Sequence, residues 1–234
     1  MSDSNQNSPA SSDTISSQTF FVDGPAGKLE TVVDEPGGRS PRGIAVIAHP
    51  HPLFGGTMDN KVVYILFKAL LEQGFIAAKF NFRGVGRSEG KHEAADNGAG
   101  EIDDVLAVVR AVQQQFSSRF DGPAPLVLAG FSFGGAIQAF AAEKLKPQSM
   151  VMIAPAVARL NAPPVAYPRD KAGREVAPRI LIVHGDQDDV VPLNSVLEWA
   201  GPQELPVVVI PGAEHFFHRR LHILKSVVRD FYRS

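Results

Sequence analysis

The sequence predicts an α/β protein in which a mostly parallel sheet is covered by helices on both faces. From residue 20 onward, apolar runs of strand length alternate with segments whose apolar residues recur at helical spacing. Strands that are apolar throughout are typical of a sheet buried on both faces. Their alternation with helices indicates parallel βαβ units, and no internal repeat interrupts it.

The first strands are separated by turn-forming sequence. Residues 20–23 and 29–34 flank Gly-Pro-Ala-Gly, so we expect them to pair as an antiparallel hairpin. Residues 44–49 form the next apolar run, which leads directly into a loop with two prolines. Further apolar runs predict strands over residues 75–82, 126–129, 149–154, 180–184 and 207–210.

The clearest helix covers residues 60–73. Its apolar residues follow the i, i+3, i+4, i+7, i+8 pattern, Asp59 or Asn60 can cap its N-terminus, and Gly74 can end it. Apolar residues on one helical face, or a run rich in alanine, predict further helices over residues 101–116, 134–144, 194–200 and 219–232.

Two segments fall outside this alternation. Residues 1–18 contain seven serines and neither lysine nor arginine, so we expect residues 1–19 to be a disordered tail. Residues 155–178 contain five prolines and no sustained helical period, and we interpret them as a short lid-like loop. We therefore expect a single domain over residues 20–234.

The composition excludes several classes of protein. The net charge is −2 without a basic block, which argues against nucleic-acid binding. The absence of cysteine removes disulfides, thiolate metal sites and cysteine nucleophiles, and fits a reducing compartment. The serine-rich start lacks the features of a secretory signal, and no stretch approaches the ~18 apolar residues of a membrane span. We expect a cytoplasmic protein that binds no membrane.

Ser132 is the most informative residue of the chain. It follows the apolar run 126–129 and is flanked by Gly130 and Gly134. This pattern is typical of a sharp turn from a strand to a helix, which exposes the serine hydroxyl above the sheet. A neutral hydroxyl is a poor nucleophile, so the interpretation requires a histidine base and a carboxylate elsewhere in the chain.

Both partners follow later strands. Asp188 lies in His-Gly-Asp-Gln-Asp-Asp-Val-Val-Pro after the run 180–184, and His215 lies in Gly-Ala-Glu-His-Phe-Phe after the run 207–210. Ligands bind at the carboxyl ends of strands in open parallel sheets. The order serine, aspartate, histidine matches a nucleophile on such a turn. Asp186 and Asp189 are neighbouring candidates, but the spacing to Val-Pro selects Asp188.

With these three motifs the sequence resembles the α/β-hydrolase superfamily over about residues 19–234. Residues 81–88 and 49–60 look like those of a small, lid-poor bacterial branch, and the acidic motif is similar to that of dienelactone hydrolases and prolyl peptidases. The resemblance implies a three-layer α/β-hydrolase fold with a mostly parallel sheet of about eight strands. It also implies that Ser132 is the nucleophile, His215 the general base and Asp188 the residue that orients it.

The same resemblance implies an oxyanion hole made of backbone N–H groups. One donor is the amide of Phe133, and the second comes from the loop after residues 44–49. Pro50 and Pro52 have no N–H, so His51 or Leu53 must supply it, and His51 is favoured.

The implied function is hydrolysis of a carboxylic ester or thioester of a small soluble substrate through an acyl-enzyme on Ser132. A serine peptidase of prolyl-peptidase type and a non-catalytic binding protein with this fold are the alternatives. We expect no cofactor, and the sequence leaves the oligomeric state open.

Several other patterns have ordinary structural interpretations. His49 and His51 lack a carboxylate at ligand spacing, so we expect no metal. The glycines of residues 84–90 only faintly resemble a dinucleotide loop. Asp103 and Asp104 are expected to form a solvated charge pair at a helix N-terminus.

Two further features stay open. Phe216 and Phe217 could line an acyl pocket or belong to the core. The loop 155–178 is mildly basic because it contains Arg159, Arg169, Lys171 and Arg174. We interpret these residues as part of a solvated surface, with recognition of an acidic substrate as the alternative.

Overall fold

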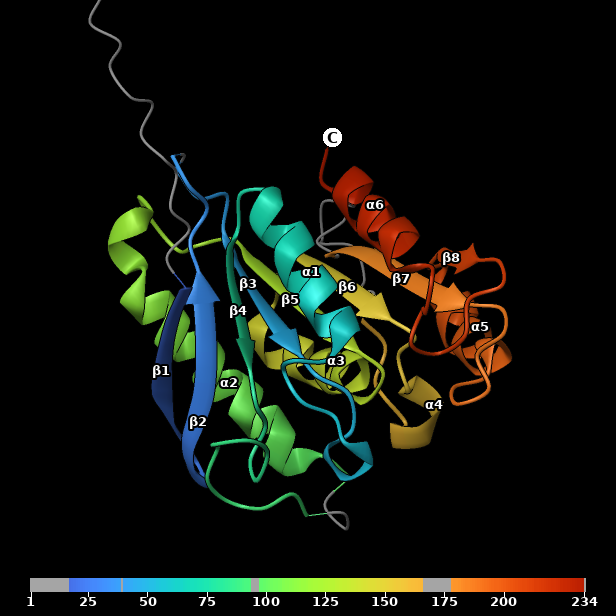
Figure 1. Cartoon of the computed structure of the whole chain (residues 1–234), viewed down its shortest axis with the longest axis horizontal. Coiled ribbons are helices and arrows are strands. Elements are labelled where there is room, and N and C mark those ends of the chain that lie inside the picture. The colour runs from blue at the N-terminus through green and yellow to red at the C-terminus, as the bar shows by residue number, and fades with distance from the viewer. Residues whose placement is uncertain (1–16, 39, 94–96, 166–177, 234) are drawn as a thin grey trace, which may run out of the picture.

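The computed structural model describes residues 17–38, 40–93, 97–165 and 178–233. An eight-stranded sheet runs through its centre in the order β1-β2-β4-β3-β5-β6-β7-β8 (Figure 1). The pairs β1–β2 and β2–β4 are antiparallel, and all the others are parallel, which confirms the predicted sheet. The strands are β1 Ser17–Gly24, β2 Gly27–Asp34, β3 Ile44–Ala48, β4 Ile76–Phe80, β5 Leu126–Phe131, β6 Ser149–Ile153, β7 Arg179–Gly185 and β8 Val207–Ile210.

Helices cover both faces of this sheet. The α-helices are α1 Lys61–Glu72, α2 Ala99–Gln115, α3 Phe133–Leu145, α4 Val157–Leu160, α5 Leu193–Ala200 and α6 Leu221–Phe231, and the 3-10 helices are η1 Pro52–Phe54, η3 Ser117–Arg119 and η4 Gly201–Gln203. Figure 1 shows α1 and α6 together on one face, and α2 and α3 pack on the other. None of the helices within the described ranges is long and apolar enough to cross a membrane.

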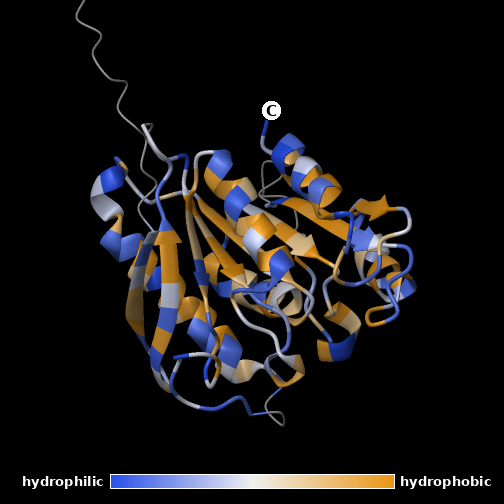
Figure 2. Cartoon of the chain, in the orientation of Figure 1, coloured by the Kyte–Doolittle hydropathy of each residue, from blue (hydrophilic) through white to orange (hydrophobic). Residues whose placement is uncertain are grey.

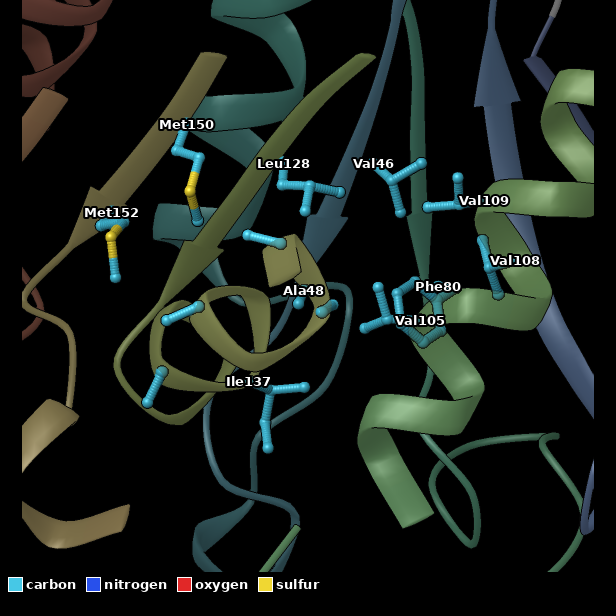
Figure 3. Close-up of a cluster of buried hydrophobic side chains, with 14 of the residues drawn as sticks. Val46, Ala48, Phe80, Val105, Val108, Val109, Leu128, Ile137, Met150 and Met152 are labelled. Carbon is cyan, nitrogen blue, oxygen red and sulfur yellow. The ribbon is translucent and has the colours of Figure 1, made fainter. Parts of the chain in front are cut away.

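The core is divided into two layers by the sheet. Successive residues of a strand point to opposite faces, so Val46 of β3 packs toward α2 and α3, whereas Ala45 and Ile47 pack toward α1. Figure 2 accordingly shows strands that are hydrophobic along most of their length. Figure 3 shows the layer between the sheet and helices α2 and α3, with Val46, Ala48, Phe80, Val105, Val108, Val109, Leu128, Ile137, Met150 and Met152.

The parallel register brings the carboxyl ends of several strands to one edge. Phe131 at the end of β5 lies beside Ile153 at the end of β6, which lies beside Val183 in β7. Gly185 at the end of β7 lies beside Ile210 at the end of β8. The loops that follow these strands therefore lie next to one another, although they are far apart in the sequence.

Most predicted elements agree with the observed ones to within two residues at either end. The first difference is larger, since β1 begins at Ser17, inside the segment expected to be a tail. Residues 17–19 pair with residues 32–34 of β2, so ladder hydrogen bonds order a segment whose side chains are exposed. Residues 1–16 lie outside the described residues.

The second difference concerns the segment 155–178. Its first part forms α4, because Val157 and Leu160 lie one turn apart and are both buried against the core. One helical turn is too short to give a recognisable period in the sequence. Residues 166–177, with Arg169, Lys171 and Arg174, lie outside the described residues.

Candidate active site

Ser132 lies on a sharp turn between β5 and α3. Its backbone has φ 54° and ψ −117°, a conformation that residues with a Cβ rarely adopt. The flanking glycines are required by close packing: a Cβ on Gly130 would lie 2.5 Å from the carbonyl carbon of Gly134, and one on Gly134 would lie 2.4 Å from the carbonyl oxygen of Ala48. The turn therefore needs small residues on both sides of the serine.

The structure brings Ser132, His215 and Asp188 together in one hydrogen-bonded series. His215 Nε2 lies 3.0 Å from Ser132 Oγ, and His215 Nδ1 lies 2.7 Å from Asp188 Oδ2. Asp188 follows β7 and His215 follows β8, so each partner comes from the loop after a strand, as predicted. The geometry allows His215 to accept the hydroxyl proton of Ser132.

Asp188 is held as a carboxylate. Its Oδ1 accepts the N–H groups of Val190, at 2.9 Å, and Val191, at 2.8 Å. Burial raises the pKa of Asp188, but the hydrogen bonds from His215 and from these N–H groups outweigh burial and keep the pKa below its usual value. A carboxylate at Nδ1 keeps the proton on that nitrogen and leaves Nε2 free to accept.

The neighbouring aspartates have other positions. Asp186 Oδ1 accepts the N–H of Gly212 at 2.6 Å, which links the loops after β7 and β8. Asp189 is exposed. Of the three aspartates in this motif, Asp188 is the one within hydrogen-bonding distance of His215.

Phe133 and His51, the residues expected to donate to an oxyanion, lie at the cavity. Phe133 and His51 both line the cavity above Ser132, and within the described residues neither donates its backbone N–H to a hydrogen bond. Leu53 is the poorer of the two expected alternatives, because its N–H donates to His51 Nδ1 at 3.2 Å and its side chain points to solvent, 63% exposed. Of these two residues, the N–H of Leu53 is therefore already used within the loop.

His49 fixes the loop that carries His51. Its Nδ1 lies 2.6 Å from the carbonyl oxygen of Pro50, and its Nε2 accepts the N–H of Phe82 at 3.0 Å. Complete burial lowers the pKa of His49 to about 4, so the ring stays neutral and keeps this tautomer. Both ring nitrogens of His49 are therefore engaged in the backbone geometry of the loop.

A cavity of about 520 Å³ opens above Ser132 and His215. Its walls are largely apolar and include Phe54, Leu160, Val190 and Phe216. Phe217 is instead fully buried in the core beneath. The open question about this pair is therefore resolved by burial: Phe216 lines the cavity and Phe217 packs inside. A larger cavity at the opposite end of the strands, near Arg42, contains none of the three residues.

Sequence reasoning missed several buried polar groups around the site. Asp104, expected to be solvated, is completely buried and binds Arg83 at 2.7 Å, because α2 packs against the loop after β4. His92 pairs with Glu101 at 2.9 Å, and the His92 ring lies 5.0 Å from the His51 ring. The position of Arg83 directly after the strand predicted over residues 75–82 was the available signal.

The remaining polar contacts hold the surrounding loops. His184 is buried, and its Nε2 donates to the carbonyl oxygen of Val191 at 2.8 Å, which steadies the Asp188 loop. The glycine-containing loop 84–90 is organised around Glu30, which accepts the side chain of Asn81 and the N–H of Arg87. A Cβ on Gly86 would lie 2.4 Å from Asn81 Nδ2, so this glycine is required by the packing of the loop.

The fold and the arrangement of Ser132, His215 and Asp188 define a member of the α/β-hydrolase superfamily. A family model described as "Serine aminopeptidase, S33" matches residues 40–167, more than half of the chain. The chain belongs to this family of hydrolases.

Individual relatives extend the likeness beyond those residues. The chain is 32% identical to the uncharacterized protein RP471 of Rickettsia prowazekii, over 91% of this chain and 87% of that one. It is similar to a solved α/β serine hydrolase homologue from Coxiella burnetii, with 40% identity, 91% and 96% coverage and a TM-score of 0.77. It is also similar to XC6422 from Xanthomonas campestris, an α/β serine hydrolase without a lid, with 35% identity, 93% and 94% coverage and a TM-score of 0.76.

Proposed function

We propose that this protein hydrolyses a carboxylic ester or thioester of a small substrate through an acyl-enzyme on Ser132. One observation carries the proposal: Ser132, His215 and Asp188 form an unbroken hydrogen-bonded series at the floor of an open cavity. Phe133 and His51 line the same cavity, and we assign their backbone N–H groups as the donors to an oxyanion.

In the acylation step, Ser132 Oγ attacks the carbonyl carbon of the substrate while His215 Nε2 takes the hydroxyl proton. The carbonyl oxygen becomes an oxyanion that accepts hydrogen bonds from Phe133 and His51. Asp188 stabilises the positive charge that develops on the imidazole. Collapse of the tetrahedral intermediate breaks the bond to the leaving oxygen or sulfur, which receives the proton from His215.

Deacylation repeats the same chemistry with water. His215 Nε2 takes a proton from the water molecule as its oxygen attacks the acyl carbon on Ser132. Collapse of the second intermediate releases the carboxylic acid and returns the proton to Ser132 Oγ. The cavity is open to solvent above the serine, which gives water access to this step.

The charge of the cavity supports an ester or thioester over an aminopeptidase substrate. An aminopeptidase must recognise a free ammonium group, which a carboxylate in the cavity would bind. Among the described residues, no aspartate or glutamate lines the cavity, and its wall carries Arg159 instead. A cation in that position opposes the binding of an ammonium group.

The size of the cavity supports a small substrate. A volume of about 520 Å³ is suited to a molecule of modest size, and the walls offer apolar contacts to an acyl chain. The related Xanthomonas protein is described as a serine hydrolase without a lid. An uncovered site favours small or flexible substrates over a lipid surface.

Labelling with a fluorophosphonate tests whether Ser132 is an activated nucleophile. We expect stoichiometric modification of Ser132 in the folded protein and none in Ser132→Ala. Ser118→Ala, which removes an exposed serine on η3, is the matched control and should label normally. Absence of labelling in the folded wild-type protein would favour the non-catalytic binding protein.

Rates of hydrolysis identify the bond that is cleaved. We expect turnover of 4-nitrophenyl esters with a maximum of kcat/KM between acetyl and butyryl chains, and only trace turnover of aminoacyl 4-nitroanilides. A maximum at decanoyl or longer chains would contradict the small-substrate argument. Faster cleavage of the nitroanilides than of the esters would support the peptidase instead.

A further inference from the structure

Arg159 is placed in the wall of the active-site cavity. It carries the one permanent charge on the part of the wall that the structure describes, and no aspartate or glutamate accompanies it there. The other lining residues are apolar side chains, glycines, two asparagines, Ser132 and the histidines His51 and His215. A lone guanidinium in such a setting is a recognition feature for a negatively charged group.

The segment that carries Arg159 is anchored directly to the nucleophile. The N–H of Ala156 donates to the carbonyl oxygen of Ser132 at 3.0 Å, immediately before α4. At the other end of α4, Asn97 Nδ2 donates to the carbonyl oxygen of Leu160 at 3.1 Å. The Trp199 indole N–H holds the carbonyl oxygen of Ala162 at 3.0 Å. These contacts fix the backbone that carries Arg159 relative to Ser132.

The guanidinium of Arg159 retains most of its hydrogen-bonding capacity. Within the described residues its hydrogen bond is a long one, 3.4 Å from Nη2 to the carbonyl oxygen of Val190, and no carboxylate lies within 4.0 Å. A bond of this length at an exposed position contributes little to stability. The planar array of N–H groups matches the two oxygens of a carboxylate.

The charge of Arg159 affects another residue of the cavity lining, His51. The pKa of His51 is lowered first by burial and then by the positive charges of His92 and Arg159. Arg159 thus lies near enough to His51 to affect its pKa and contacts Val190, which lies in the same loop as Asp188. Arg159 and Ser132 line the same cavity, so a substrate bound above Ser132 shares that cavity with the guanidinium.

We propose that Arg159 is a specificity-determining residue that binds a carboxylate of the substrate. The preferred substrates are then esters or thioesters that carry a carboxylate separated from the scissile bond by an apolar spacer. The apolar walls contact the spacer, and the guanidinium binds the anionic end. This inference rests on the proposed function, since it concerns the substrate of the same site.

Two pairs of substrates test the proposal from either side of the scissile bond. In the first pair the acyl chain ends in a carboxylate or in its neutral amide: the mono-4-nitrophenyl ester of adipic acid against that of adipic monoamide. In the second pair the leaving group carries the charge: 4-acetoxybenzoate against 4-acetoxybenzamide. The readout is the ratio of kcat/KM for the anionic substrate to that for its neutral partner.

We expect this ratio to exceed unity by about tenfold in at least one pair, as for a charge-assisted hydrogen bond. Arg159→Gln should reduce the ratio in that pair by about tenfold, and Arg159→Lys should keep part of it. Added salt should reduce the ratio in the wild-type protein. Arg110→Gln, which removes an exposed arginine on α2, is the control and should leave the ratio unchanged.

The outcomes separate this inference from the proposed function. If Ser132 is labelled and neutral esters are hydrolysed, but neither pair shows a preference for the anion, the assignment of Arg159 is overturned and the esterase proposal stands. The assignment of Arg159 is also overturned if Arg159→Gln lowers kcat/KM equally for the anionic and the neutral substrate of a pair. If neither labelling nor ester hydrolysis occurs, the proposed function fails and the inference falls with it.

Discussion

Replacing Ser132 by glycine should make the protein more stable than replacing it by alanine, although both changes remove the hydroxyl. Ser132 has φ 54° and ψ −117° because the turn between β5 and α3 is too tight for an ordinary backbone conformation. Glycine adopts positive φ without steric cost, whereas alanine keeps the Cβ. The comparison of the two variants isolates the backbone strain at the nucleophile.

The size of the difference follows from two opposing terms. A non-glycine residue held in a sparsely populated backbone region costs roughly 1–3 kcal/mol. Glycine in turn loses more conformational entropy on folding, roughly 0.5–1 kcal/mol. Both variants lose the 3.0 Å hydrogen bond between Ser132 Oγ and His215, so that loss cancels. The balance favours Ser132→Gly over Ser132→Ala by about 1 kcal/mol, or roughly 2–4 °C in Tm.

Urea unfolding followed by the fluorescence of Trp199, the single tryptophan, measures this difference. Ala107→Gly, in the middle of α2, is the control, because there glycine replaces alanine in an ordinary helical conformation. This variant should lower the free energy of unfolding by about 1 kcal/mol. Neither Ser132 variant should hydrolyse the esters that the wild-type protein cleaves. Equal stability of the two variants, or a less stable glycine variant, would refute the argument that the turn is strained.

Three further predictions follow from the polar contacts. Asp188→Asn should lower kcat by about 10⁴-fold, because His215 would then adopt the wrong tautomer. The kcat of Asp186→Asn and of Asp189→Asn should stay within about tenfold of the wild-type value. Equal losses of kcat in the three variants would overturn the assignment of Asp188. His49 has a folded-state pKa of about 4, below its usual value, so it contributes stability above pH ~6.5 that is lost as the pH falls toward 4. The stability advantage of the wild-type protein over His49→Gln, measured by urea unfolding, should therefore shrink by up to about 3 kcal/mol across that range. Burial raises the pKa of Tyr232 to about 12, so its contribution is complete below pH ~10 and is lost as the pH rises toward 12. At pH 9, Tyr232→Phe should be less stable than the wild-type protein, because it loses a 2.8 Å hydrogen bond to Ser149. Near pH 11.5 its free energy of unfolding should match or exceed that of the wild-type protein. A difference in stability that stays constant with pH would contradict this prediction.

The fold was predictable because its signals are local. Helices such as α1 bury one face, so their apolar residues recur at the helical period, and the central strands are buried on both faces and read as apolar runs. The elements that were missed have no such signal. Ser17 enters β1 through backbone pairing with Asp34, and α4 is a single turn. Pairing partners distant in the chain cannot be read from the composition of one segment.

The three residues of the site were predictable because each lies in a short motif directly after a strand. Ser132, Asp188 and His215 each follow an apolar run, and the parallel sheet places the ends of those runs at one edge. The choice between His51 and Leu53 was different, because it depends on which N–H is already used in the folded loop. The burial of Asp104 was also hidden, since it depends on the packing of α2 against Arg83.

The sequence by itself determined the α/β class, the eight strands and the three residues that meet at Ser132. These follow from periodicity and from motifs that lie within short stretches of chain. Only the tertiary structure decided which N–H groups remain free, which aromatic ring faces the cavity and where Arg159 lies relative to the nucleophile. These depend on contacts between segments that are distant in the sequence, and such contacts exist only once the loops at the carboxyl edge of the sheet have packed together.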